Sequence, residues 1–370
     1  MLELNGNKWT ALHLLVNEIC LDPPKNDTEN LWYFGPGVNN GEAYKYVVDG
    51  KLQVPSGKTI YLDTGAFLTA SLHFSSVSNA SVRGHGFIYK PPSSPKFRME
   101  QQGAFLIERS SDISIKQVTS LSATGFSFLA GQSKGIAING YRSFSSCGNG
   151  DGLHFLSCSD VLIEDCFLRT SDDAIAINCH RWDYYGNTEN FTVRNCVLLP
   201  DIAHPILVGT HGNPSDPEHI RHINISNVDI LDHDENQLWY QGCIALNAGD
   251  GNLIEDVHVE GVRIEKISKG QLVNIRVMQN AMWTSKPGRG IRNVTIKNLR
   301  LNAADSQVVN PSQILGYDQE RGIEDILFED LVIDDETIHE AMTKPRWYMV
   351  EDFVPMFVNE HVRNLRLARR

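Results

Sequence analysis

Three aspartates in two neighbouring motifs provide the residue types that acid–base chemistry needs. Asp151 lies in the Asn-Gly-Asp-Gly motif at 149–152, and Asp172 and Asp173 lie in the Ser-Asp-Asp-Ala motif at 171–174. Each motif opens a short alternating apolar strand, two residues after Asp151 or Asp173. If the two strands are neighbours, these carboxylates lie about 4.8 Å apart, with Asp172 beside them. Like charges so close raise the pKa of at least one carboxyl group, which favours acid–base chemistry.

His204 fits the same register as the aspartates. It stands two residues before Ile206, the first inward-facing residue of its strand. We therefore expect Asp151, Asp173 and His204 to come from three successive turns into one groove. A histidine hydrogen-bonded to the carboxylates would hold the cluster partly protonated. His211 is a second, lower-ranked candidate for this position, and a turn histidine bonded only to the backbone is the structural alternative.

An internal repeat runs through most of the chain and would bring these strands together. Each copy is a polar residue, an apolar-x-apolar strand, a small or polar pair and another apolar residue. The spacing of the copies is typical of stacked-repeat architectures. The last apolar residues of the strands recur at intervals of 23 to 37 residues: Val82, Ile115, Ile138, Ile163, Val193, Ile225, Val259, Ile296 and Phe328.

The repeat predicts an all-β chain that forms a right-handed parallel β-helix, or β-solenoid, of about ten turns. A helical solenoid would need apolar residues at i, i+3, i+4 and i+7, and that pattern is missing. We expect the β-helical catalytic domain over residues 51–370. Residues 1–50 lack the repeat and are expected to form strands that cap the coil, because a solenoid must cover its terminal core layer. They are also compatible with the end of a truncated upstream domain.

Composition limits the function classes. The 370 residues carry a net charge of −12 without a basic stripe, which argues against nucleic acid as a partner. No apolar run is long enough to span a membrane. The seven cysteines show no metal-ligand spacing, so we expect neither a metal nor a cofactor. We expect a monomer that binds carbohydrate. No signal peptide is visible, and we expect a secreted or periplasmic location for the full-length protein.

The motifs resemble those of a known family. The Asn-x-Asp-Gly motif, the Asp-Asp pair and the later His-Pro-Ile-Leu-Val-Gly-Thr are similar to the polygalacturonases of glycoside hydrolase family 28. The chain is also similar to the wider β-helical glycosidase clan that contains the family 49 dextranases. The resemblance implies that Asp172 is the general acid, while Asp151 and Asp173 hold and deprotonate the water in an inverting hydrolysis. The family has Gly-His-Gly where this chain has Ala203, His204 and Pro205.

The family's Arg-Ile-Lys motif, whose cations bind the uronic carboxylate, has no full counterpart here. In the closest phrase, Arg276 is followed by Met278 in place of the lysine, and the phrase lies about one turn too far along the coil. The turn before it places Asn247 in the equivalent outward position. A neutral residue there and the net charge of −12 favour a neutral or sparsely uronic glycan. A plain surface arginine is the alternative for Arg276.

Other polar and aromatic residues near the motifs are predicted to bind substrate. Aromatic rings stack on the C–H faces of sugars, although such rings also pack against the coil. The predicted substrate-binding residues are Asn149, Asn178, His211, Asn247, Arg276, Trp182, Trp239 and Tyr240.

The sequence thus predicts an inverting glycoside hydrolase that acts on a plant or microbial polysaccharide or oligosaccharide. Three alternatives stay open. A structural Asn/Asp ladder in the turns would have no chemistry. A polysaccharide lyase or epimerase on the same fold would use Ca²⁺ bound by oxygen ligands such as the three aspartates. A non-catalytic glycan-binding solenoid would bind without turnover.

Overall fold

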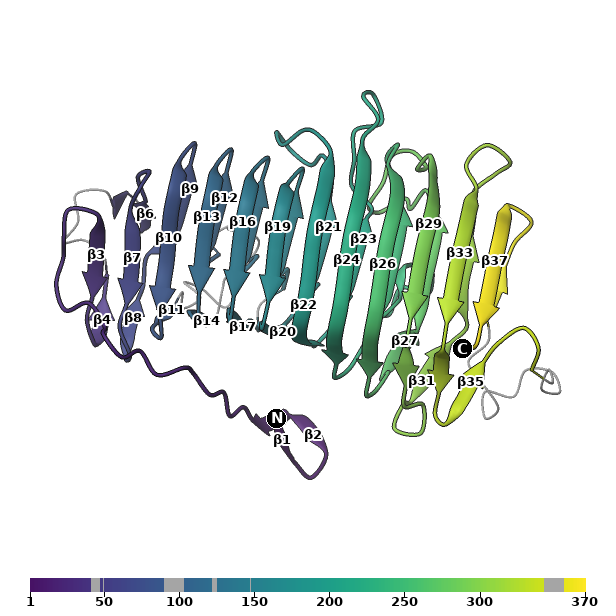
Figure 1. The fold of residues 1–370 in the computed structure, drawn as a ribbon, viewed down its shortest axis with the longest axis horizontal. Coiled ribbons are helices and arrows are strands. Elements are labelled where there is room, and N and C mark those ends of the chain that lie inside the picture. Colours follow the sequence, from purple (N-terminus) through teal and green to yellow (C-terminus); the bar gives the residue numbers. More distant parts are fainter. Residues whose placement is uncertain (41–46, 49, 90–102, 122–124, 147, 343–355) are drawn as a thin grey trace.

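The computed structural model describes residues 1–40, 47–48, 50–89, 103–121, 125–146, 148–342 and 356–370. Within these residues the fold is all-β, and the single helical element is the short 3₁₀ helix η1 (Leu238–Tyr240). No helix in the described part of the chain has the length and apolar character needed to cross a membrane. Most strands belong to two long sheets whose strands are mainly parallel and follow one another along the molecule (Figure 1).

The larger sheet has 21 strands, and most of its pairs join one turn of the coil to the next. Its strands are β3 (Leu31–Phe34), β4 (Gly37–Asn39), β7 (Thr59–Leu62), β8 (Ala66–Leu68), β10 (Ser78–Gly84), β11 (Phe87–Tyr89), β13 (Ser111–Lys116), β14 (Thr119–Leu121), β16 (Lys134–Asn139), β17 (Arg142–Phe144), β19 (Ser159–Glu164), β20 (Phe167–Thr170), β22 (Thr188–Pro200), β24 (His219–Ile230), β26 (Leu253–Ile264), β29 (Gly290–Lys297), β30 (Arg300–Leu301), β33 (Ile323–Glu329), β34 (Leu331–Ile333), β35 (Glu336–Ile338) and β37 (Val362–Ala368).

The smaller sheet has 12 strands. In spatial order they are β5 (Val47–Val48), β6 (Lys51–Gln53), β9 (Ser71–Ser75), β12 (Phe105–Glu108), β15 (Phe128–Gly131), β18 (Leu153–Leu156), β21 (Ile175–Asn178), β23 (Ile206–Gly209), β25 (Ile244–Ala248), β28 (Val273–Val277), β32 (Ser312–Leu315) and β36 (Met356–Val358). Two further pairs are the antiparallel hairpin β1 (Leu2–Leu4) and β2 (Asn7–Leu12), and the parallel pair β27 (Lys269–Gln271) and β31 (Val308–Asn310).

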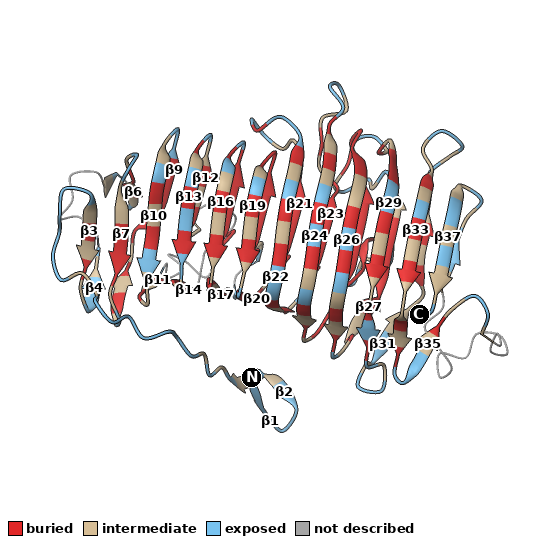
Figure 2. Cartoon of the chain, in the orientation of Figure 1, coloured by how far each residue is buried: buried red, intermediate tan, exposed pale blue. Residues whose placement is uncertain are grey.

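The core lies between the two long sheets and consists of inward-facing ladders. Buried and accessible residues alternate along the strands of the larger sheet (Figure 2). The nine apolar residues expected to align do align, because each pairs with the next in parallel register from Val82 to Phe328. All nine are at most 1% exposed. The parallel solenoid is therefore confirmed, while its right-handed sense and its count of about ten turns stay predictions.

The polar residue that opens each repeat has a backbone reason. Asn79, Asp112, Asp160, Asn190 and Asp256 have φ between 56° and 62°, in the left-handed region that asparagine and aspartate tolerate best among residues with side chains. Most copies therefore begin with Asn or Asp because the chain turns sharply there before it enters the next strand, and His222 and Gly135 adopt the same backbone conformation in two other copies.

Part of the N-terminal region joins the coil. Parallel pairing starts at β3, which pairs with β7, and so precedes the expected boundary at residue 51. The alternating Leu31–Phe34 segment buries Trp32 and Phe34 in the core, although the polar opening of the repeat is absent. The hairpin β1–β2 lies far from the first turn (Figure 1), and Lys8 forms an ion pair of 2.7 Å with Asp232, just after β24. This hairpin therefore does not cover the first core layer.

Candidate active site

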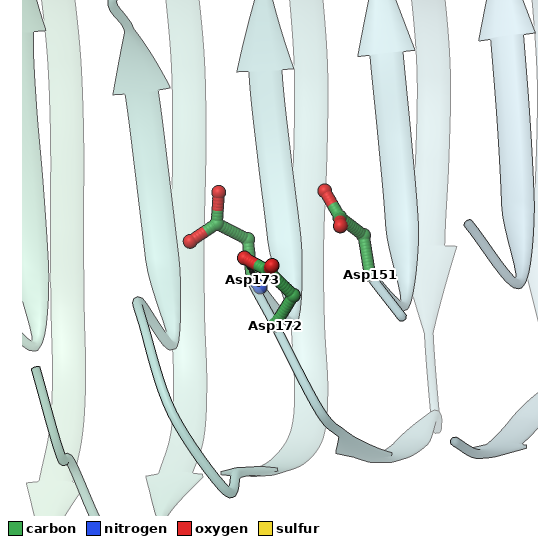
Figure 3. Close-up of side chains that lie close together, drawn as sticks. All are labelled: Asp151, Asp172 and Asp173. Atoms are coloured by element: carbon green, nitrogen blue, oxygen red, sulfur yellow. Dashed lines mark hydrogen bonds between the residues drawn. The ribbon is translucent and has the colours of Figure 1, made fainter. Parts of the chain in front are cut away.

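The register of three adjacent strands brings the predicted residues together. Leu153 of β18 pairs with Ile175 of β21, which pairs with Ile206 of β23. The residues two positions earlier therefore share one edge of the smaller sheet: Asp151, Asp173 and His204. Figure 3 shows Asp151, Asp172 and Asp173 rising on the same side of two neighbouring turns. One oxygen from each of the three carboxyl groups lies within 4.8 Å of the others.

A cavity of about 280 Å³ opens above these residues. Its walls come from strands β18, β21 and β23, from the turns that precede them, and from residues before β15 and after β21, β23, β24 and β28. The lining residues are Phe126, Asn149, Asp151, His154, Asp172, Asp173, Asn178, Arg181, Ile202, Ala203, His204, Leu207, His211, Glu235, Asn236, Gln237, Tyr240 and Trp283.

His204 and Asp173 form a buried ion pair. The Nδ1 of His204 lies 2.7 Å from Oδ1 of Asp173, and the backbone N–H of His204 donates to the same oxygen at 2.9 Å. The Nε2 of His204 lies 2.6 Å from the carbonyl oxygen of Tyr240. A carbonyl and an ionised carboxylate can only accept hydrogen bonds, so the ring carries a proton on both nitrogens.

The pKa shifts agree with this assignment. Burial disfavours both charges, but the attraction between the two groups and their hydrogen bonds outweigh it. The pKa of Asp173 is therefore lowered and the pKa of His204 is raised. Asp173 is thus held ionised at the base of the cavity.

The pKa of Asp172 is shifted in the opposite direction from that of Asp173. Burial, followed by the charge of the adjacent Asp173, raises the pKa of Asp172 to about 7. Oδ1 of Asp172 accepts the backbone N–H of Asp173 at 3.0 Å, which fixes the orientation of the carboxyl group. The pair therefore places a carboxylic acid that stays protonated near neutral pH next to an ionised carboxylate.

A chain of hydrogen bonds fixes the orientation of Asp151. The backbone N–H of His211 donates to Oδ1 of Asn178 at 3.3 Å, so the amide nitrogen of Asn178 faces Nε2 of His154 at 3.4 Å. His154 therefore accepts at Nε2 and donates from Nδ1 to Oδ2 of Asp151 at 2.7 Å. Burial and the charge of Arg181 lower the pKa of His154 to about 3, so the ring is neutral.

Asp151 itself is buried at the wall of the cavity. Burial, together with the charges of Asp172 and Asp173, raises its pKa well above the usual aspartate value. One of its oxygens accepts from His154, which leaves the other free to carry a proton. Among the three aspartates, Asp173 is therefore the one that the surroundings keep ionised.

Arg181 and Glu235 complete the charge distribution of the cavity and were not predicted. Arg181 is the only lysine or arginine among the lining residues, and its charge lowers the pKa of Asp151. Burial raises the pKa of Glu235. Alternation within the strand 153–155 places His154 outward, so the sequence could have indicated this residue. Arg181 and Glu235 lie outside the repeat positions, so no such pattern indicates them.

The predicted substrate-binding residues divide into two groups. Asn149, Asn178, His211 and Tyr240 line the cavity with the catalytic candidates. Burial, followed by the charge of Arg181, lowers the pKa of His211 to about 3, and Nδ1 of His204 rather than His211 contacts Asp173.

Four others lie outside this cavity: Asn247, Arg276, Trp182 and Trp239.

Each residue outside the cavity has a structural reason for its place. Asn247 does not point outward to solvent as expected, because it is fully buried and donates to the carbonyl and side-chain oxygens of Asn274. Arg276 donates to the carbonyl oxygen of Trp239 at 2.6 Å, and the Trp239 side chain is 63% exposed. Trp182 borders a second cavity.

An apolar surface adjoins the carboxylates. The outward-facing residues next to the ladder that carries the aspartates are Ala176, Leu207 and Ala245, which pair in register across β21, β23 and β25. Tyr240 and Met278 pack on them, and Trp283 covers the cluster. The turn after His204, where the resemblance would place cations, therefore presents apolar groups.

The three aspartates could hold a metal ion, because each offers an oxygen at a suitable distance. The surroundings fit this poorly. Oδ1 of Asp173 already accepts two hydrogen bonds from His204, and the cationic His204 and Arg181 lie close to the cluster.

The family model for "Glycosyl hydrolases family 28" matches residues 47–343. Among curated proteins, a polygalacturonase of Chamaecyparis obtusa is 22% identical over 210 residues, which are 56% of this chain and 38% of that protein. The chain thus spans well under half the length of this relative.

Solved structures give a similar result for the fold. An exopolygalacturonase of Thermotoga maritima superposes with a TM-score of 0.59 at 14% identity, over 82% of this chain and 79% of that one. A family 28 exopolygalacturonase of Yersinia enterocolitica gives a TM-score of 0.60 at 12% identity, over 90% and 72% of the two chains.

Proposed function

The chain belongs to family 28 of the glycosyl hydrolases, and from this premise we propose that it hydrolyses a polysaccharide or oligosaccharide with inversion. The observation that carries the proposal is the division of charge within the aspartate cluster. Asp172, with its pKa raised to about 7, is the general acid, and Asp173, held ionised by His204, is the general base.

The proposed reaction is a single displacement. The proton of Asp172 passes to the glycosidic oxygen as the bond to the anomeric carbon breaks. A water molecule attacks that carbon from the opposite face, and Asp173 accepts the proton that the water loses. Asp151, oriented by His154, holds the water through a hydrogen bond. The product sugar therefore has the anomeric configuration opposite to that of the substrate linkage.

The spacing of the carboxyl groups is not the support for inversion. Inverting glycosidases usually separate acid and base by roughly 6.5–9.5 Å, whereas the nearest oxygens of this cluster lie within 4.8 Å. The support is instead the two hydrogen bonds that Oδ1 of Asp173 accepts from His204. They occupy one oxygen of the Asp173 carboxylate and fix its orientation, and they leave the other oxygen to bind water.

We propose an uncharged or sparsely uronic glycan as the substrate. Four carboxyl groups line the cavity, and a single arginine, Arg181, accompanies them. The wall beside His204 presents Leu207, Tyr240 and Trp283, which suit the C–H face of a sugar better than a carboxylate. Action on such a polymer agrees with the expected secreted or periplasmic location, which stays a prediction.

The test is a screen of plant and microbial polysaccharides with detection of new reducing ends, followed by NMR of the first product formed. Inversion is expected. A retained anomeric configuration, or a covalent adduct on Asp151 or Asp173, would refute the roles assigned here.

A metal-dependent lyase is the second candidate, because the three aspartates could bind Ca²⁺. The two functions differ in their response to chelation. The hydrolase should keep its activity in EDTA and form no unsaturated product that absorbs in the ultraviolet. Loss of activity in EDTA that Ca²⁺ restores would favour the lyase.

A further inference from the structure

A second cavity of about 310 Å³ lies on the same outer face of the smaller sheet as the active site. Strands β9, β12 and β15 and the segment after β21 provide its lining residues. Phe126 belongs to both cavities, so the two share a wall. The Phe126 ring stacks on His154, the partner of Asp151, with the ring centroids 4.6 Å apart.

The outward-facing ladder of the smaller sheet connects the two cavities. His73, Leu106 and Leu129 of the second cavity pair in register with one another, and Leu129 pairs with His154 of the active site. Strand β12 is three strand spacings from β21, which is about 14 Å. A polymer on this face would therefore pass over more than one turn between the second cavity and Asp172.

The segment that carries Trp182 is held firmly on the coil. The Tyr184 ring lies on Gly131, where an added Cβ would come within 2.5 Å of the ring. The Tyr184 hydroxyl donates to Glu108 at 3.0 Å, and Arg109 donates to the Asp183 carboxylate at 2.7 Å. These contacts fix the neighbours of Trp182.

Trp182 itself stays 40% exposed at the edge of the cavity. The Arg181 guanidinium lies over its ring, 4.6 Å from the centroid. A large aromatic side chain that is held in place but exposed beside a cavity can stack on a sugar ring at little cost in conformational entropy.

The charges around this cavity disfavour an anion. Glu108 and Asp183 are its charged lining residues, and both are acidic. Glu108 accepts hydrogen bonds from Ser75 and Tyr184, and the nearby Arg109 is already bonded to Asp183. A uronate carboxylate placed beside Glu108 would therefore meet a like charge, and Arg109 is not free to bind it because Asp183 already balances its charge.

We propose that the second cavity is a distal subsite that binds an uncharged sugar of the same glycan chain whose bond is cleaved at Asp172. The subsite makes the substrate a chain of several residues, with at least one uncharged residue stacked on Trp182. This inference rests on the proposed function, because it assumes that a glycan occupies the active site.

The experiment measures binding of oligosaccharides of two to seven residues to the full chain with Asp172→Asn, so that turnover does not interfere. The probes are oligogalacturonides, their carboxyl-reduced and therefore uncharged counterparts, and uncharged plant and microbial oligosaccharide series. Trp182→Ala is compared with Tyr317→Ala. Tyr317 is a matched control, because it is 42% exposed and has the Arg321 guanidinium 4.7 Å from its ring centroid, but it lines neither cavity.

We expect affinity for an uncharged series to rise with chain length. Trp182→Ala should lower affinity for the longest chains about 5- to 10-fold and leave the shortest chains unchanged. Tyr317→Ala should lower neither. Unchanged binding of long chains by Trp182→Ala, or no length-dependent binding of any uncharged series, would overturn the proposal.

The proposed hydrolase and the proposed subsite can be refuted independently of each other. Length-dependent binding that needs Trp182, without cleavage of any glycan by the unmodified chain, would keep the subsite and refute the proposed hydrolase. Cleavage with equal efficiency on short and long chains would keep the hydrolase and refute the subsite.

Discussion

The same residue type, aspartate, serves two different purposes on two sides of this coil. On the larger sheet, Asp160, Asp165 and Asp256 stand at sharp turns with φ of 56–57°. Each accepts a hydrogen bond from an asparagine one turn later, such as Asn195 to Asp165 at 3.2 Å. On the smaller sheet, Asp151, Asp172 and Asp173 have no such backbone strain and crowd together above the coil.

The difference separates aspartates that shape turns from aspartates whose pKa values suit the proposed acid–base chemistry. We call the turn residues of the larger sheet, in which asparagines bond to aspartates one turn earlier, the asparagine ladder. An aspartate there tolerates the left-handed backbone, and a neutral amide neighbour stabilises it. An aspartate of the cluster faces other carboxyl groups with little solvent, an arrangement that costs stability and raises the pKa of Asp172 and Asp151. The Asn/Asp ladder considered as an alternative for the cluster is therefore present, but on the other sheet.

The largest expected effect comes from removing the acid. Asp172→Asn should lower turnover by about 10³-fold or more while substrate binding persists, because the leaving group loses its proton donor. A substrate with a good leaving group should recover much of the rate. The matched change in the ladder, Asp165→Asn, should leave turnover as it is. Comparable losses in both variants would break the distinction between the two regions.

Next in size is the effect of His204→Gln. Without the cationic ring, the pKa of Asp173 should rise, because burial is no longer outweighed. The base is active only when ionised, so the acidic limb of the kcat/KM profile should move to higher pH, and turnover should fall by about 10²-fold. An unchanged acidic limb, measured as the pH profile, would show that His204 does not set the charge of Asp173.

A smaller effect is expected at Asn178, which acts through His154. Asn178→Ala removes the amide that faces Nε2 of His154, so the proton of that ring is free to change nitrogen and Asp151 loses its fixed donor. We expect about a 10-fold loss in kcat with little change in KM. A variant whose kcat falls in parallel with its thermal stability at every pH would indicate that Asn178 has a purely structural role.

The cost of the cluster should be visible in stability. The folded-state pKa of Asp172 is raised to about 7, so between pH 4 and 7 the folded protein binds a proton that the unfolded chain has released. Stability from this group is therefore lost as pH rises through about 7. Asp172→Asn should be more stable than the unmodified chain by about 1–3 kcal/mol at pH 8, with a smaller difference at pH 4. Denaturant unfolding at both values measures this, and no gain at pH 8 would contradict it.

The smallest effect belongs to the asparagine ladder. Asn195 has φ of 56° and bonds to Asp165 on one side and Asn227 on the other. Asn195→Ala should lower the free energy of unfolding by about 1–2 kcal/mol, because alanine tolerates the left-handed backbone poorly. Turnover should not change. If the Asn195→Ala protein is fully folded but has lost activity, the ladder influences the active site.

The sequence was sufficient for the inner half of this architecture. Alternation placed residues such as Ile163 and Val193 inside the coil, and the same register carried Asp151, Asp173 and His204 to one edge. Each of these positions is determined by its own strand and its nearest neighbour, so a local pattern contains the information.

Features that depend on distant segments were not readable. Alternation placed Asn247 outward, but it is fully buried and bonds to Asn274, because an outward side chain is exposed only where no later segment covers it. Lys8 and Asp232, which form an ion pair, are 224 residues apart in the sequence. Neither position has a repeat pattern that could have indicated its partner.

The ladder that links the second cavity to the active site has an evolutionary consequence. Residues such as Leu106, Leu129 and Leu207 line the two cavities, so replacing them changes the groove while the inward residues that hold the turns together stay the same. Each turn is thus a separate position at which selection can alter one contact with a polymer. A lineage of such proteins can drift from one polymer to another by single steps, without passing through unfolded intermediates.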